Sequence, residues 1–60
     1  MRDPKRIEKV LGILRLYWEA NPDLRLGQIV GNVARDVGLG PYYMEDDILV
    51  QVLQDALKGQ

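Results

Sequence analysis

The fold of this 60-residue chain depends first on residues 7–18, which read IEKVLGILRLYW. Apolar side chains recur there with successive spacings of three, one, three, three and one residues, the pattern of a stripe along a helix. Ile13 and Leu16 widen the apolar surface beyond that stripe. A helix that is apolar on more than one side needs more than one surface to pack against. The stripe consists of Ile7, Val10, Leu11, Leu14, Tyr17 and Trp18.

Signals at helix ends divide the rest of the chain. Asp3-Pro4 is typical of an N-cap followed by proline in the first turn, so the first helix begins near residue 4. Asn21-Pro22 ends it, because asparagine tolerates a left-handed C-cap and proline cannot continue a helix. Two shorter apolar stripes follow, separated by the loop Gly38-Leu39-Gly40-Pro41. The sequence predicts an all-α fold in a single domain 1–60, a compact bundle of three short helices at roughly 4–20, 26–37 and 46–58.

The second predicted helix contains two glycines, Gly27 and Gly31, four residues apart on one face. Each costs about 1 kcal/mol relative to alanine inside a helix. Because small residues let a neighbouring backbone approach closely, we expect a tight helix crossing at this face. Gly38 stands where a helix C-cap adopts the left-handed conformation.

The chain is so short that the stability of its core requires an explanation. A domain of this size buries only about 60% of the surface that its unfolded chain exposes. The chain has no Cys and no His, so neither a disulfide nor a usual zinc site can add stability. Two alternatives stay open: the helices pack well on their own, or homodimerisation completes the core. Residues 1–30 carry six Lys or Arg against four Asp or Glu, and residues 31–60 carry two against five. An antiparallel pair of chains would therefore bring opposite charges together.

The composition argues against catalysis. The chain also lacks Ser and Thr, so most of the side chains that serve nucleophilic enzymes and metal sites are missing. We therefore expect no enzymatic activity, no catalytic residue, no cofactor and no metal. The run Glu45-Asp46-Asp47 is an acidic cluster where a helix begins, and acids are expected there for structural reasons. No apolar run approaches the roughly 20 residues of a membrane span, so we expect a cytoplasmic protein without a membrane partner.

The aromatic side chains indicate where a partner would bind. Trp18 lies on the apolar stripe, and we expect it to anchor the core. One of Tyr17, Tyr42 and Tyr43 is expected at the surface, and tyrosine is enriched in interface hot spots. We therefore expect a protein-interaction module, an adaptor or small inhibitor, that binds an unidentified protein partner. The expected surface comprises Tyr42, Tyr43, Asp46 and Asp47.

The alternative function is a regulatory small-ligand or nucleic-acid binder that uses the basic first helix. Its basic patch comprises Arg2, Lys5, Arg6 and Lys9. A helix-turn-helix mode is not expected, because the third helix would enter the groove with residues 45–47, all acidic, and has no Arg or Lys before Lys58. The net charge of −1 gives no general attraction to nucleic acid, so we do not expect nucleic acid as the partner.

One ordered set of residues extends over most of the chain. Val10-Leu11, Ile13-Leu14 and Trp18 are followed by Pro22-Asp23-Leu24, Leu26 and Gln28, and later by Ala34, Gly38 and Asp46-Asp47-Ile48-Leu49. This arrangement resembles the YihD family of small bacterial proteins, and the resemblance implies a helical cytosolic protein without indicating an activity. Acids before a helix accept hydrogen bonds from its first amides, so we expect Asp23 to cap the second helix and Asp46 the third.

Overall fold

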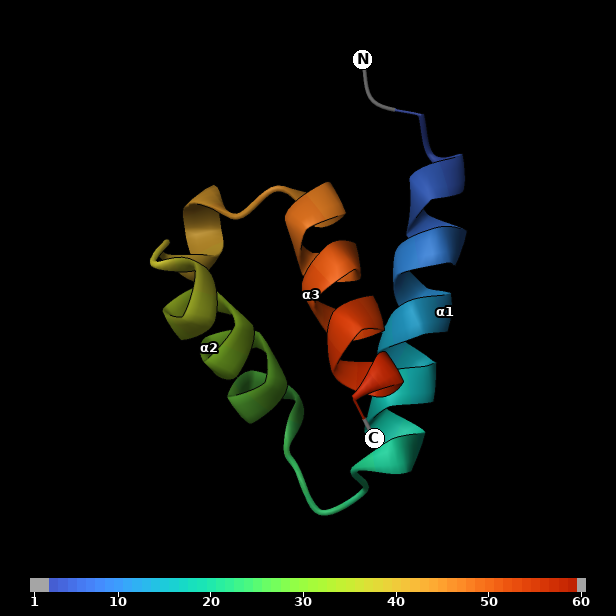
Figure 1. Ribbon diagram of the computed structural model, residues 1–60. Coiled ribbons are helices and arrows are strands. Elements are labelled where there is room, and N and C mark those ends of the chain that lie inside the picture. The colour runs from blue at the N-terminus through green and yellow to red at the C-terminus, as the bar shows by residue number, and fades with distance from the viewer. Residues whose placement is uncertain (1–2, 60) are drawn as a thin grey trace.

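The computed structural model describes residues 3–59 of the protein, and regular secondary structure in that range is entirely helical. The all-α fold of three helices is confirmed. Helices α2 and α3 have the predicted bounds, and α1 begins one residue later than predicted. A short 3₁₀ helix, η1, lies where the sequence indicates only a loop. The elements are α1 (Lys5–Ala20), α2 (Leu26–Val37), η1 (Pro41–Tyr43) and α3 (Asp46–Lys58) (Figure 1).

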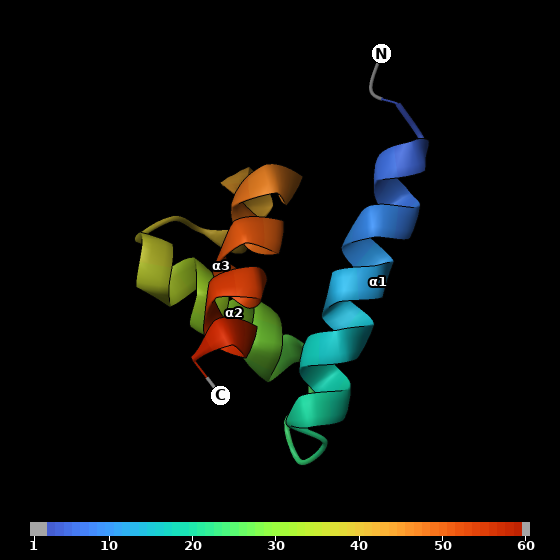
Figure 2. The same ribbon diagram turned by 45° about the vertical axis from the view of Figure 1, so that its right-hand side comes forward.

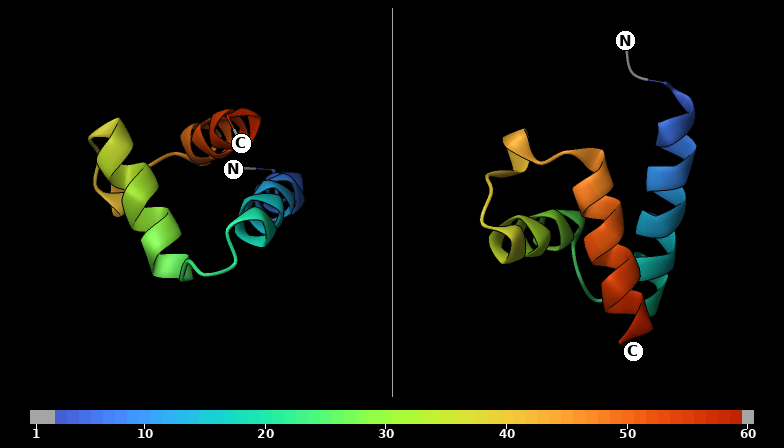
Figure 3. Two further views of the ribbon diagram at one scale, coloured as in Figure 1. Left: turned by 60° about the horizontal axis from the view of Figure 1, so that its bottom comes forward. Right: turned by 45° about the horizontal axis from the view of Figure 1, so that its top comes forward.

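Helix α3 lies between the other two helices. It runs side by side with α1 and in the same direction, so the N-terminal ends of both helices lie at one end of the molecule (Figures 1 and 2). Helix α2 runs back toward that end and crosses α3 at a large angle (Figure 3). This parallel arrangement of α1 and α3 brings together residues that are about 40 positions apart in the sequence, as the Arg6–Asp46 ion pair shows.

The two ends of α1 are fixed by polar side chains. The Asp3 carboxylate accepts a hydrogen bond of 2.9 Å from the Lys5 backbone N–H, which confirms the predicted N-cap. At the other end the prediction of a left-handed C-cap is wrong, because Asn21 has φ −135° and ψ 65°. Instead, the Asn21 side-chain amide donates to the Tyr17 carbonyl at 3.0 Å and so satisfies a carbonyl of the last turn.

Neither of the predicted acidic caps is present. Helix α2 begins after Arg25, whose backbone N–H donates to the Gln28 side-chain oxygen at 2.8 Å. Gln28 lies three residues into the helix and reaches back to the N–H of the residue before it, which is a different hydrogen bond from the one expected of Asp23. Helix α3 begins after Glu45, and no side chain caps it there. Asp46 pairs with Arg6 instead.

The glycines of α2 give one confirmed and one wrong prediction. Gly38 adopts φ 74° as the C-cap, the left-handed conformation that the sequence predicts. Gly27 and Gly31 do not mark a tight crossing. A Cβ atom at either position would have no neighbour within 4 Å. Both are exposed on the side of α2 away from the core.

The core of the described chain is small and belongs to two helices. Ile29 and Leu53 are each 1% exposed, and they meet where α2 and α3 pack. Helix α1 has no buried residue, although half-buried side chains from it pack against this core. The buried residues of positions 3–59 are Ile29, Val33, Ala34, Val50 and Leu53.

Trp18 does not anchor the core, so that prediction is wrong. Its side chain remains 36% exposed, and its indole N–H donates to the Leu24 carbonyl at 2.7 Å. Tyr17, its neighbour, is half-buried and packs against the core cluster. Trp18 holds the α1–α2 connection to the end of α1.

Candidate interaction surface

The connection between α2 and α3 forms a short anchored segment. Pro41 opens η1, the Tyr43 backbone N–H donates to the Gly40 carbonyl at 3.0 Å, and the Met44 N–H donates to the Pro41 carbonyl at 3.3 Å. The Met44 side chain packs against the core. Because the segment is hydrogen-bonded at one point and packed at the next, its two tyrosines project from a defined backbone.

Tyr42 and Tyr43 form an exposed aromatic pair on η1. Tyr42 is 91% exposed and Tyr43 is 75% exposed. Their ring centroids lie 5.1 Å apart with the planes at 78°, an edge-to-face arrangement. The prediction that a tyrosine lies at the surface is confirmed for both. Two adjacent aromatic rings that gain little burial in the fold are available for contact with another molecule.

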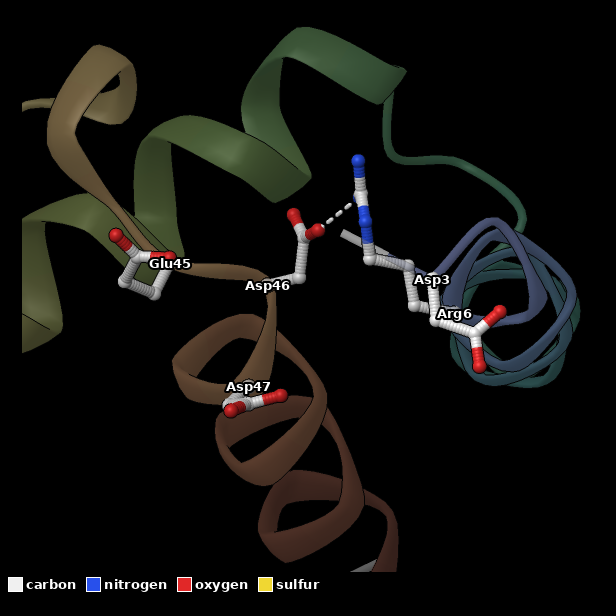
Figure 4. A pocket seen from close by; sticks show the side chains of 5 residues that line it. All are labelled: Asp3, Arg6, Glu45, Asp46 and Asp47. Atoms are coloured by element: carbon white, nitrogen blue, oxygen red, sulfur yellow. Dashed lines mark hydrogen bonds and ion pairs between the residues drawn. The ribbon is translucent and has the colours of Figure 1, made fainter. Parts of the chain in front are cut away.

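Close to this pair in the sequence, an open hollow of about 230 Å³ lies at the shared end of α1 and α3. In Figure 4, Arg6 extends from α1 and forms an ion pair with the Asp46 carboxylate at the start of α3. This contact exists only because the two helices are parallel. The hollow is lined by Asp3, Arg6, Glu45, Asp46 and Asp47.

The carboxylates around the hollow do not converge. Asp46 points toward Arg6, whereas Glu45 and Asp47 point in other directions (Figure 4). Within residues 3–59, no three acidic side chains are grouped so that they could hold a metal ion. The hollow is also smaller than the roughly 300 Å³ at which small-molecule pockets usually begin. Its shape therefore favours contact with another surface over enclosure of a ligand.

The residues of the expected surface have different roles in the structure. Tyr42, Tyr43 and Asp47 are exposed, but Asp46 is only partly exposed and its charge is offset by Arg6. Sequence reasoning missed this ion pair, because its only local signal is that each residue stands near the start of a helix.

The basic patch of the alternative function is only partly described. Lys5 and Lys9 are exposed, and Arg6 is engaged with Asp46. Arg2 lies outside the described residues. Of the patch residues that the structure describes, Arg6 is the one that contacts a carboxylate of α3.

Comparisons of the chain with protein-family models, curated proteins and solved structures find no match. The resemblance to the YihD family stays a prediction. In the part of the chain that the structure describes, no helix combines the length and apolar character needed to cross a membrane. Function has to be inferred from the surface of the molecule itself.

Proposed function

We propose that the protein is a protein-interaction module, an adaptor or small inhibitor, that binds a cationic segment of a partner protein. The proposed surface comprises Tyr42, Tyr43, Asp46 and Asp47. The observation that carries the proposal is the adjacent pair of tyrosines, 91% and 75% exposed, followed after Met44 by the acidic residues 45–47 at the start of α3. A cytoplasmic location belongs to the same proposal and is supported by the family resemblance.

The chemistry of this surface suits a segment rich in Arg or Lys. A guanidinium or ammonium group is attracted to the face of a tyrosine ring, by about 0.5–2 kcal/mol depending on desolvation. Asp47 is exposed and supplies a charge of the complementary sign. Asp46, paired with Arg6, contributes less free charge and helps to hold α1 beside the surface.

The anchoring of η1 also favours binding. Met44 packs on the core, and the hydrogen bonds of Tyr43 and Met44 fix the backbone from which the rings project. A surface that is already ordered loses less conformational entropy when a partner binds. The tyrosines, with two side-chain torsions each, add contact area at a small further loss.

The alternative, a nucleic-acid or small-ligand binder that uses the basic first helix, has weaker support. Arg6 faces the Asp46 carboxylate, so its charge is partly neutralised at the place where a phosphate would bind. Lys5 and Lys9 are exposed on α1. The acids that line the hollow beside Arg6 would repel a polyanion that approached this end of α1.

The test is a titration of the ¹⁵N-labelled full chain with a short arginine-rich peptide at low salt, followed by NMR. We expect the largest shift changes at residues 42–47. Tyr43→Ala should weaken binding about 10-fold, as for a typical aromatic hot spot. Asp47→Lys should weaken it by a similar factor and reduce its salt dependence. The matched control is Leu16→Ala, which removes an exposed apolar side chain from α1.

Peptide binding that survives both Tyr43→Ala and Asp47→Lys would show that the proposed surface is wrong. A parallel titration with mixed oligonucleotides at about 50 mM salt examines the alternative, since electrostatic attraction to phosphate is strong there. Oligonucleotide binding that is lost when Lys5 and Lys9 are replaced by Gln would favour the basic first helix instead.

A further inference from the structure

Helix α1 carries three apolar side chains on one side that the rest of the described chain leaves partly exposed. Ile7, Leu11 and Trp18 are 47%, 55% and 36% exposed. Their spacings of four and seven residues place them on one side of the helix. Leu14, at the edge of this side, and Ile13 and Tyr17, on the neighbouring side, pack against the core. Helix α1 is therefore apolar on two sides, of which only one is packed. We refer to Ile7, Leu11 and Trp18 as the α1 stripe.

The flanking charges indicate what kind of surface would cover the stripe. Glu8 and Arg15 are seven residues apart and lie along the same edge of it. Consider an antiparallel pair of α1 helices in which Ile7 of each copy lies opposite Trp18 of the other. The axial positions of Glu8 in one copy and Arg15 in the other then differ by only about 3 Å. The contact occurs twice because the pair is two-fold symmetric. In a parallel pair, this edge of one helix would meet the other edge of its partner, so Glu8 and Arg15 would not meet.

The sparse core gives a second reason for self-association. Among residues 3–59 only five side chains are buried, and α1 contributes none of them. Chains of this size that lack disulfides and metals commonly complete their core by oligomerisation. A second α1 helix has both the length and the apolar stripe to cover the first, since each stripe extends about 16 Å.

We infer that the α1 stripe is the contact face of a homodimer in which two copies of this chain pack their α1 helices antiparallel. The face is separate from the surface on η1, so the inference does not depend on the proposed function. The apolar contact is short, and interfaces of small area are usually weak. We therefore expect dimerisation in the micromolar range.

Sedimentation equilibrium of the full chain, from about 1 µM to 1 mM, tests for the dimer. The mass should rise from 6.9 kDa toward twice that value with concentration. Leu11→Glu places a charge in the stripe of each copy and should weaken dimerisation at least about 100-fold. The control is Leu16→Glu, a substitution at a 57%-exposed leucine on the opposite side of α1, which should leave the dimer unchanged.

The orientation of the helices is tested with charge exchange. Glu8→Arg keeps the stripe intact, so it remains informative even if Leu11→Glu disturbs folding. It should weaken the homodimer several-fold, because it places like charges opposite each other twice. Mixing the Glu8→Arg chain with an Arg15→Glu chain should restore dimerisation as a heterodimer.

Cross-linking gives an independent measure of orientation, since the chain contains no cysteine. A short thiol-reactive cross-linker should join a Glu8→Cys chain to an Arg15→Cys chain in preference to two chains of either kind. The inference is overturned if the protein stays monomeric at 1 mM, if Leu16→Glu dissociates the dimer while Leu11→Glu does not, or if like cysteines cross-link preferentially.

Discussion

Helix α1 and the α2–α3 pair differ in how they are held in the fold. The buried side chains of residues 3–59 all belong to α2 and α3, which are shorter than α1. Helix α1 is joined to α3 by the Arg6–Asp46 ion pair near its start and to the following loop by the Trp18–Leu24 hydrogen bond near its end. Half-buried side chains lie between these two contacts. The apolar content of a helix thus does not by itself decide how deeply the helix is buried. The topology determines whether other helices of the same chain cover its apolar side chains.

The largest effect is expected in the α2–α3 core. Leu53 is 1% exposed, and Leu53→Ala should destabilise the protein by about 2–5 kcal/mol through lost burial and a new cavity. A domain of this size has a total free energy of unfolding of only about 3–9 kcal/mol. We therefore expect a largely unfolded chain by circular dichroism and urea denaturation. Leu16→Ala in α1, at fixed protein concentration, should change stability by less than about 0.5 kcal/mol. Equal effects of the two substitutions would remove the distinction between the regions.

A smaller effect is expected where α1 meets the loop. Trp18→Phe removes the indole N–H that donates to the Leu24 carbonyl at 2.7 Å, and should lower stability by about 1 kcal/mol. Faster amide hydrogen exchange in α1 and the loop than in α2 and α3 would show that the loss is local. Tyr42→Phe, at a 91%-exposed ring, is the aromatic control and should leave stability unchanged. A loss in Trp18→Phe distributed equally over all three helices would mean that α1 is as integral to the core as its neighbours.

The smallest effect is expected at the Arg6–Asp46 ion pair. Both side chains are partly exposed, so Arg6→Gln should cost less than about 1 kcal/mol. The loss should disappear at about 1 M salt, where exposed charges are screened within a few ångströms. Urea denaturation at low and high salt measures both quantities, with Lys9→Gln as the control one turn further along α1. A loss that is unchanged by salt would show that Arg6 acts through packing.

Local signals predict the helices well because each end depends on nearby residues. The Asp3 cap and the left-handed Gly38 follow from residue type and position alone. At other helix ends, the residue that makes the hydrogen bond is determined by which side chain can reach the backbone group. At the start of α2, Gln28 reaches back to accept from the Arg25 N–H, and Asp23 is not the cap residue. Asn21 uses its side chain, rather than a left-handed backbone, to end α1.

The contacts between elements could not be predicted from the sequence. Gly27 and Gly31 permit a close crossing, but no neighbouring helix approaches them. Trp18 lies on an apolar stripe whose outer edge no other helix covers, and it is therefore partly exposed. Asp46 is drawn away from capping by Arg6, which is 40 residues distant in sequence. The last of these outcomes depends on α1 and α3 being parallel.

In the candidate surface, too, the local exposure of side chains could be predicted from the sequence and their spatial arrangement could not. Exposure of Tyr42 and Tyr43 follows from the short apolar segment between two helix signals, which has no periodic stripe to bury it. Their edge-to-face arrangement on a 3₁₀ helix had no recognisable sequence signal. The chemistry of the partner is inferred from the neighbouring acids.

The parallel packing of α1 and α3 has an electrostatic consequence. The peptide dipoles of each helix leave a partial positive charge at its N-terminus, so parallel neighbours bring two such poles together instead of pairing opposite ones. Asp3 lies at one of these poles, and Glu45, Asp46 and Asp47 lie at the other (Figure 4). The negative charges of these carboxylates offset the partial positive charge at both N-termini. The acidity of residues 45–47 thus serves the arrangement of the helices as well as any partner that binds there.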